Sequence, residues 1–308
     1  MLWTWGWMAD LVGDAMTNTA VTTTSLTKRY GETFALNNIS ISVERGSVNG
    51  LVGPNGAGKT TLLSLLAGLR EPTSGSLTVA AANLGVLPDT PLFDRWLTGY
   101  EVVALAQNLA PTEIPPTRID EVLEAAGLHD AKNRRVGGYS RGMLQRLGLA
   151  STVVGEPDLI LLDEPAAALD PRGRREVLDL VAELRGRSTV IFSSHILDDV
   201  QQVCDTIGIL SGGELVYEGS LDRLLNIHGT DRTYWVEASD PEAVHRALTG
   251  EAWVSSATVE TSGVTVVGST SDEIRASIVP FVGSLDVEIT AVTPVRRSLE
   301  DVFLQVTR

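Results

Sequence analysis

One short run near residue 53 constrains the fold of this chain more than any other feature. It reads Gly53-Pro-Asn-Gly-Ala-Gly-Lys59-Thr60, follows the apolar pair Leu51-Val52 and precedes the apolar segment TTLLSLLAGL. Glycines let the backbone bend so that several N–H groups converge on one anion at the start of a helix. Between a strand and a helix, the pattern G-x-x-x-x-G-K-[ST] is typical of a loop that binds nucleotide phosphates. The run therefore predicts an α/β unit with a nucleotide at the carboxyl ends of its strands.

Each position of this loop has a predicted contact. We expect the backbone N–H groups to surround the phosphates, the Lys59 ammonium to lie against the β- and γ-phosphates, and the Thr60 hydroxyl to bind Mg²⁺. The nucleotide-binding residues predicted from the loop are Gly53, Pro54, Asn55, Gly56, Ala57, Gly58, Lys59, Thr60 and Thr61. A glycine-rich turn with an incidental lysine is the alternative, which the flanking strand and helix disfavour.

A second motif, LILLDE at 159–164, places four apolar residues before Asp163 and Glu164. A continuous apolar run of this kind is typical of a strand buried in a parallel sheet. We expect Asp163, at the tip of the strand, to bind Mg²⁺, and Glu164 to polarise the water that attacks the γ-phosphate. A helix start carrying two acids before Pro165 is the alternative, and the apolar strand before it makes that reading weaker.

The pattern of apolar residues divides the chain into segments of different character. Residues 17–50 alternate like strands, residues 95–155 contain helix-period segments, and 188–194 is another buried strand. After 232, four strand-like runs are interleaved with helices near 240–248 and 271–280. We therefore expect a disordered leader over 1–16, an ATP-binding domain over 17–225 with a helical subdomain, and a small α+β domain over 226–308.

Composition limits the partners of such a chain. Its 308 residues carry a formal net charge of −15 and one cysteine, Cys204. An acidic surface disfavours nucleic acid, whose phosphates require Lys and Arg, and one cysteine allows no intramolecular disulfide and no cysteine-based metal site. No run reaches the roughly 18 apolar residues of a membrane span. A partner inside the membrane would therefore be a separate polypeptide.

The motifs, in this order over about residues 22–225, resemble those of ABC transporter ATP-binding subunits, and the ending SLEDVFLQV is similar to the daunorubicin-resistance branch of bacterial exporters. The resemblance implies four further site residues. Tyr30 of KRYG matches the aromatic that stacks on adenine, and His195 of FSSHIL matches the switch histidine at the γ-phosphate. Ser140 and Gly142 of YSRGM match the family signature, which contacts the ATP of a partner subunit.

The same resemblance implies the fold and the function. The fold is the P-loop NTPase fold of an ABC-type nucleotide-binding domain, and the cofactors are ATP and Mg²⁺. The chain would be the ATP-hydrolysing motor of an exporter at the cytoplasmic face of the membrane, acting as an ATP-dependent dimer with a membrane permease on a separate chain. A soluble ABC-type ATPase with no transport role and a regulatory ATP-binding protein remain the alternatives.

One departure from the family pattern concerns a loop that contacts Mg²⁺ and the membrane subunit. The family often has Gln there, whereas this chain reads Val86-Leu-Pro-Asp89. A carboxylate adds charge and has a different reach from an amide. We therefore leave Asp89 outside the predicted site residues and treat its role as open.

Overall fold

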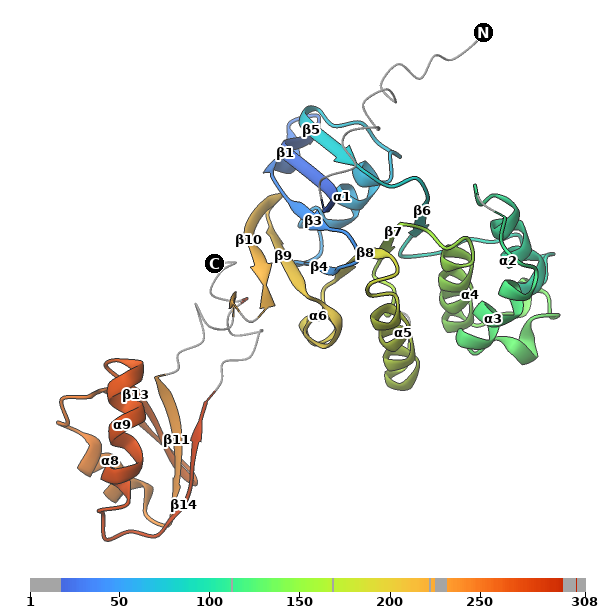
Figure 1. Cartoon of the computed structure of the whole chain (residues 1–308). Coiled ribbons are helices and arrows are strands. Elements are labelled where there is room, and N and C mark those ends of the chain that lie inside the picture. Colours follow the sequence, from blue (N-terminus) through green and yellow to red (C-terminus); the bar gives the residue numbers. More distant parts are fainter. Residues whose placement is uncertain are drawn as a thin grey trace. The chain divides into compact units, whose positions relative to one another are not determined.

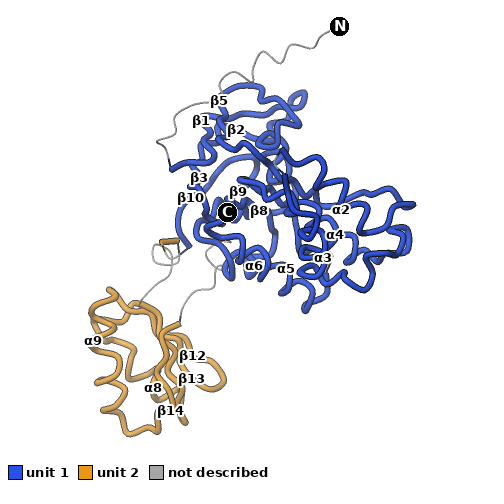
Figure 2. Tube along the Cα trace, turned by 45° about the vertical axis from the view of Figure 1, so that its right-hand side comes forward, with its two compact units in different colours: residues 1–221, 307 blue, residues 222–306, 308 orange. Residues whose placement is uncertain are grey.

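The computed structural model describes residues 18–111, 113–167, 169–221, 223–224, 232–295 and 303. The predicted leader, residues 1–16, lies outside the described residues. The chain forms two compact units, residues 1–221 with 307, and residues 222–306 with 308, which Figure 2 colours separately. Each unit has its own sheet and its own apolar core. None of the helices in the described ranges has the length and apolar character needed to span a membrane.

The first unit is built around a six-stranded sheet with the order β10-β9-β4-β8-β7-β6. All pairs in it are parallel except the hairpin of β9 and β10. Every residue of β4, β7 and β8 is buried, as expected for central strands of a sheet that is covered on both faces. The strands are β4 (Val48–Val52), β6 (Leu84–Leu87), β7 (Leu159–Asp163), β8 (Thr189–Ser194), β9 (Thr206–Ser211) and β10 (Glu214–Ser220).

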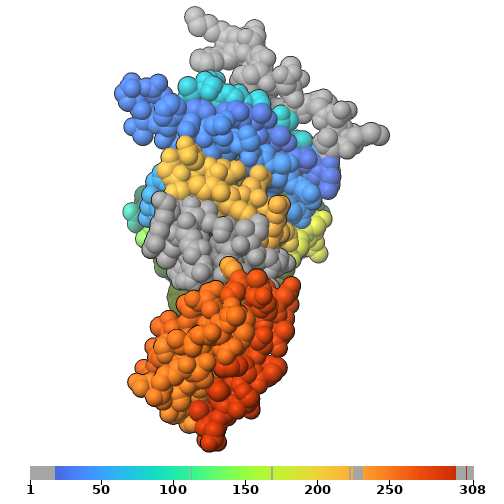
Figure 3. Space-filling view, turned by 90° about the vertical axis from the view of Figure 1, so that its left-hand side faces the viewer, coloured from blue at the N-terminus to red at the C-terminus, as the bar shows by residue number. Residues whose placement is uncertain are grey.

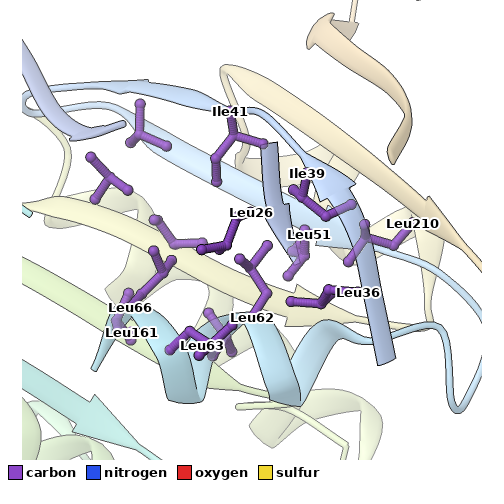
Figure 4. Packing of buried hydrophobic residues seen from close by; sticks show 14 of the residues in the cluster. Leu26, Leu36, Ile39, Ile41, Leu51, Leu62, Leu63, Leu66, Leu161 and Leu210 are labelled. Atoms are coloured by element: carbon purple, nitrogen blue, oxygen red, sulfur yellow. The ribbon is translucent and has the colours of Figure 1, made fainter. Parts of the chain in front are cut away.

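A second, antiparallel sheet lies beside it, in which the long strand β1 pairs with three others. Its strands are β1 (Thr19–Tyr30), β2 (Thr33–Ile39), β3 (Ser42–Glu44) and β5 (Ser74–Val79). Helix α1 (Lys59–Leu66) buries four leucines in the core that the two sheets share. Figure 4 shows Leu62 of α1 facing Leu26 of β1 and Leu51 of β4 in this core. Packing from both sheets therefore holds the helix that follows the glycine-rich run.

The predicted helical segment, residues 95–155, folds as three helices with a separate core. These helices are α2 (Gly99–Asn108), α3 (Thr117–Ala125) and α4 (Arg141–Val153), with short 3₁₀ turns η2 (His129–Ala131) and η3 (Val136–Gly138) between the last two. Val103, Leu123 and Leu147 meet in the core with no exposed surface. Thr98 starts α2 with a capping box that includes Glu101. The helical subdomain is confirmed.

Two further helices cover the face of the six-stranded sheet opposite α1 (Figure 1). Helix α5 (Pro171–Glu183) begins at Asp170, whose carboxylate accepts the Gly173 N–H at 3.2 Å, and Pro171 occupies its first turn. Helix α6 (Leu197–Val203) is a short segment between β8 and β9. The sheet is thus covered on both faces, as in other α/β units.

The second unit has the element order βαββαβ. Its elements are β11 (Thr233–Ala238), α8 (Pro241–Leu248), β12 (Val254–Glu260), β13 (Gly263–Gly268), α9 (Ser271–Val282) and β14 (Ile289–Pro294). The four strands form an antiparallel sheet with the order β12-β13-β11-β14. This order is the ferredoxin-like arrangement. The predicted strands and helices of this α+β region are confirmed, and its surface is drawn in orange and red in Figure 3.

Candidate active site

A cavity of about 380 Å³ opens at the carboxyl ends of β4 and β7. Its wall combines the glycine-rich run with residues that lie far from it in the sequence. The lining residues are Ala35, Asn55, Gly56, Ala57, Gly58, Lys59, Thr60, Thr61, Asp89, Glu164, Ala167 and His195. Seven predicted loop residues, 55–61, therefore lie on one cavity together with both predicted catalytic residues.

The loop curls around the side chain of its own lysine. Lys59 is 6% exposed, and its ammonium donates to the Gly53 carbonyl at 2.7 Å and to the Pro54 carbonyl at 3.4 Å. Gly58 has φ 109°, which an L side chain rarely adopts, and a Cβ there would lie 2.5 Å from the Ala35 carbonyl oxygen. Glycine at this position therefore permits both the turn into α1 and the close approach of β2.

The turn between β9 and β10 is hydrogen-bonded to the glycine-rich loop. The Gly213 N–H donates to the Ala57 carbonyl at 3.2 Å, and the Gly213 carbonyl accepts the Asn37 N–H at 2.7 Å. Gly213 has φ 85°, so a side chain would be strained there. Figure 3 shows the blue surface of the first strands directly against the yellow surface of β9 and β10. One residue thus connects the phosphate loop to β2.

The two acidic residues after β7 are held by the neighbouring strand. Asp163 and Ser193 are paired in the parallel register of β7 and β8, and Asp163 is 6% exposed. The Ser193 hydroxyl donates to Asp163 Oδ1 at 2.5 Å. The Ser193 hydroxyl oxygen in turn accepts the Glu164 N–H at 3.0 Å. Glu164 itself has φ 50°, in the left-handed region that few residues other than glycine adopt.

The Glu164 carboxylate lies between two nitrogen groups at the cavity. Its Oε2 is 2.8 Å from Nδ1 of His195, and its Oε1 is 3.5 Å from Nζ of Lys59. The side chain of Glu164 is 14% exposed and that of His195 is 45% exposed. A base, a cation and an imidazole thus converge where the loop would place a phosphate chain. A water held by Glu164 could attack a phosphorus atom bound by the loop.

Comparison with known proteins gives the family of this chain. Residues 36–167 match the family model described as ABC transporter. An uncharacterised ABC transporter ATP-binding protein of Bacillus subtilis, YxlF, is 44% identical over 208 residues, covering 65% of this chain and 70% of that protein. The chain belongs to the ABC transporter ATP-binding proteins. Its α/β fold is therefore the P-loop NTPase fold of an ABC cassette, and its activity is ATP hydrolysis coupled to transport.

Two further comparisons extend this result. The daunorubicin resistance ATP-binding protein DrrA3 of Streptomyces coeruleorubidus is 34% identical over 310 residues, covering 95% of this chain and 97% of that protein. A solved ATP-binding subunit of an ABC transporter is 27% identical with a TM-score of 0.62, covering 68% of this chain and 93% of that one. The predicted resemblance to the drug-exporter branch is confirmed at the level of homology. Nothing supports the soluble alternative.

The predicted adenine platform of the ABC protein lies outside the residues that line the cavity. Tyr30 is the last residue of β1 and is 42% exposed. Its ring lies under two cations, 5.2 Å from Lys28 Nζ and 5.5 Å from Arg70 Cζ. The Lys28 ammonium also donates to the Glu71 carbonyl at 2.7 Å. The assignment of this exposed ring as the adenine platform stays a prediction.

The signature residues lie at the start of α4, also outside the lining of the cavity. Ser140 is exposed and caps the helix by accepting the Met143 N–H at 3.2 Å, and Gly142 is in the first turn. No acidic residue occupies that first turn, so the partial positive charge of the helix end is not neutralised locally. The helix end at Ser140 therefore keeps its partial positive charge, and the assignment of Ser140 and Gly142 as site residues stays a prediction.

Three cavity residues were not in the predicted set. One is Asp89, whose role the sequence left open and which lines the cavity wall. The other two are Ala35 and Ala167. Asp89 could have been chosen because it follows β6, whose carboxyl end lies beside that of β7. Ala35 carries no polar signal and reaches the cavity only through the packing of β2 on Gly58. Gly53, Pro54 and Asp163 do not line the cavity; the Gly53 and Pro54 carbonyls accept from the Lys59 ammonium, and Asp163 directly precedes Glu164.

Proposed function

We propose that two copies of this chain close around two ATP molecules, each bound by the phosphate loop of one copy and by Ser140 and Gly142 of the other. Hydrolysis of ATP, with Glu164 as the general base, then drives a membrane permease on a separate chain, which exports its substrate. One observation carries the proposal: the Glu164 carboxylate contacts both His195 and Lys59 on the wall of the phosphate-loop cavity.

The roles of the three side chains follow from their contacts. The Lys59 ammonium is 3.5 Å from Glu164 Oε1 and would exchange this weak ion pair for the β- and γ-phosphates of ATP. Glu164 is then available to accept a proton from water. His195 contacts the other carboxylate oxygen at 2.8 Å. A γ-phosphate bound by His195 would therefore also affect Glu164, the proposed base. ATP binding and the readiness of the base are thereby linked through one carboxylate.

The residues present also fit Mg²⁺. Thr60 lines the cavity, and Asp163 uses Oδ1 for Ser193, which leaves Oδ2 for another partner. A hydroxyl and a carboxylate are oxygen donors of the kind that Mg²⁺ binds together with nucleotide phosphates. When bound, the ion would neutralise phosphate charge. Thr60 and Asp163 would hold it from the protein side.

The dimeric arrangement is supported by where Ser140 and Gly142 lie. Ser140 is exposed and Gly142 half-buried at the start of α4, and neither lines the cavity of its own chain. The cavity is formed from one side by the loop and by residues after β6, β7 and β8. A γ-phosphate bound there would face solvent in a single copy. A second copy would supply the missing anion-binding groups through its own α4.

A surface for the permease is proposed on the helical subdomain. A hollow of about 350 Å³ lies between β6, the following residues 88–93, α2 and α4. Leu92 and Leu109 line it and are 88% and 78% exposed, and the nearby Trp96 is 74% exposed. Exposed apolar side chains of this size mark interaction sites. The hollow shares the segment after β6 with Asp89, so a partner seated there would lie next to the ATP cavity.

The direction of transport and the location follow from the relatives. DrrA3 is named for daunorubicin resistance, and this chain aligns with nearly all of it. Resistance by transport requires that the substrate leave the cell, so we propose export. The proposed permease would hold this chain at the cytoplasmic face of the membrane, where ATP is supplied.

Trapping the dimer tests the proposal. Glu164→Gln keeps the shape of the side chain and removes its basicity, so hydrolysis should fall by about 10²- to 10⁴-fold. With ATP and Mg²⁺, light scattering should then show twice the monomer mass, and with ADP it should show the monomer. Adding Ser140→Arg should disperse the dimer because it places bulk at the proposed interface.

Ser255→Arg is the matched control, because Ser255 is exposed in the second unit. The trapped dimer should survive this change. A Glu164→Gln protein that remains monomeric with ATP, alone and with its co-expressed permease, would contradict the two-copy arrangement. Hydrolysis that persists in Glu164→Gln would contradict the assignment of the base.

A further inference from the structure

Ser193, two residues before His195, has no role in the family motifs or in the proposed mechanism. Ser193 lies in β8, has no exposed surface, and is the parallel partner of Asp163 at the tip of β7. From this geometry we infer that Ser193 is a positioning residue that orients both acidic side chains of the site. The inference rests on the proposed roles of Asp163 and Glu164.

Both hydrogen-bonding functions of the Ser193 hydroxyl are used at the acids. A serine hydroxyl has one proton to donate. Here it is donated to Asp163 Oδ1 at 2.5 Å, and the oxygen accepts the Glu164 N–H at 3.0 Å. The first bond fixes one carboxylate oxygen of Asp163 and leaves the other for another partner. The second bond holds the backbone N–H of Glu164, the residue after Asp163.

The backbone bond matters because Glu164 has an uncommon conformation. Its φ of 50° lies in the left-handed region, which is unfavourable for a residue with a long side chain. Such conformations persist where surrounding contacts hold them, and they are concentrated at functional sites. The bond to Ser193 is the contact on the Glu164 N–H itself. It therefore helps to direct the carboxylate toward His195 and Lys59 rather than along the strand.

The adjacent serine, Ser194, holds the turn that carries His195, the other predicted catalytic residue. Ser194 Oγ accepts the Ile196 N–H at 3.0 Å, across the turn that carries His195, and contacts Asp199 Oδ2 at 3.3 Å. Asp199 is 4% exposed and pairs with Arg174 of α5. Two neighbouring hydroxyls thus brace two different segments, with Ser193 acting on Asp163 and Glu164 and Ser194 acting on the His195 turn.

Ser193→Ala tests the inference, with Thr189→Val as its control. Thr189 is a buried hydroxyl residue of the same strand that accepts the Gly46 N–H at 3.0 Å, at the end of β8 away from the cavity. Ser193→Ala should lower kcat by about ten- to a hundredfold, because the base is no longer held in place, while KM for ATP changes little. Thr189→Val should lower the melting temperature and leave kcat unchanged.

A second measurement separates positioning from stability. The affinity for Mn²⁺ in the presence of ADP, followed by electron paramagnetic resonance, should fall by about tenfold in Ser193→Ala and stay unchanged in Thr189→Val. Ser193→Cys keeps the volume of the side chain but bonds weakly, so it should show the same losses if the alanine variant does not fold.

The outcomes distinguish this inference from the proposed function. Wild-type kcat and wild-type Mn²⁺ affinity in Ser193→Ala or Ser193→Cys, beside an inactive Glu164→Gln, would overturn the positioning role alone. Wild-type hydrolysis in Glu164→Gln would instead overturn the proposed base. Loss of kcat and of Mn²⁺ affinity in the Ser193 variants, with Thr189→Val active, would support the inference.

Discussion

The two units of this protein bury different kinds of residue. Among the described residues, every buried polar or charged side chain lies in the first unit: Thr23, Asn49, Lys59, Gln145, Asp163, Ser188, Thr189, Ser193, Ser194 and Asp199. The core of the second unit is formed by aliphatic side chains of its sheet and two helices, such as Val236, Val264 and Ile274, which have no exposed surface. Within the described ranges, only the first unit buries polar or charged side chains.

This difference separates chemistry from packing. Burying a polar group is unfavourable unless it is hydrogen-bonded, so each such group needs a partner at a defined place. In the first unit, Lys59, Asp163 and Ser193 find these partners at the ends of parallel strands, around one cavity. An aliphatic core has no such requirement. We therefore expect substitutions of the polar groups around the cavity to alter catalysis, and substitutions in the aliphatic core of the second unit to alter stability.

The largest expected effect is that of Lys59→Ala. Removing the ammonium leaves only neutral N–H donors for the phosphates, so ATP hydrolysis should fall by at least about a hundredfold. Far-UV circular dichroism should remain native-like, because the loop is also held by Gly213 and by the packing of α1. Steady-state ATPase assays with added Mg²⁺ measure the change.

Lys132→Ala is the matched control for this substitution. Lys132 pairs with Asp120 at 2.7 Å in the helical subdomain, away from the cavity. Its removal should leave hydrolysis within about twofold, since partly exposed ion pairs contribute little. Near wild-type hydrolysis by Lys59→Ala would refute the assignment of the phosphate loop.

The second unit should respond in the opposite way. Ile274 of α9 has no exposed surface, and Ile274→Ala should reduce the stability of this unit by about 2–5 kcal/mol through the cavity it leaves. Hydrogen exchange of the amides in β11 and β13 should become faster, while ATP hydrolysis stays within about twofold. A large fall in hydrolysis would show that the two units are energetically coupled. It would contradict the separation of catalysis in the first unit from packing in the second.

Local motifs were sufficient to predict much of this molecule. The phosphate loop, the strand before Asp163 and the turn with His195 are each recognised within about ten residues, because strand, glycine and helix signals are local. The helical subdomain and the α+β character of the second unit follow from the same periodicities. The joint position of Lys59, Glu164 and His195 on one cavity then results from the parallel order of β4, β8 and β7.

The remaining features depend on contacts between distant segments. Ser193 holds Asp163 because two strands pair in one particular register, and Gly213 supports the loop from a turn more than 150 positions away. The left-handed backbone of Glu164 has no signature in a residue type that usually avoids it. The strand order of the second unit likewise depends on which strands pair, which alternation of residues does not specify.

The smallest expected effect concerns Asp89, one of the two acidic residues that line the cavity. Its carboxylate is exposed and lies on the same cavity that would receive the anionic phosphates. Asp89→Asn removes this repulsion and should tighten binding of ATP in EDTA by about two- to fivefold, which corresponds to at most about 1 kcal/mol. Isothermal titration calorimetry at two salt concentrations measures the change, and the gain should shrink at high salt because exposed charges are screened.

Asp94→Asn and Asp89→Gln sharpen this last test. Asp94 is exposed a few residues further along the chain and does not line the cavity, and its carboxylate accepts the Trp96 N–H at 3.0 Å. Its neutralisation should therefore leave ATP binding unchanged. Asp89→Gln also removes the charge and should match Asp89→Asn if repulsion is the cause. Weaker ATP binding in both Asp89 variants would mean that the carboxylate makes a favourable contact, and that the first unit uses this acid for binding rather than tolerating it.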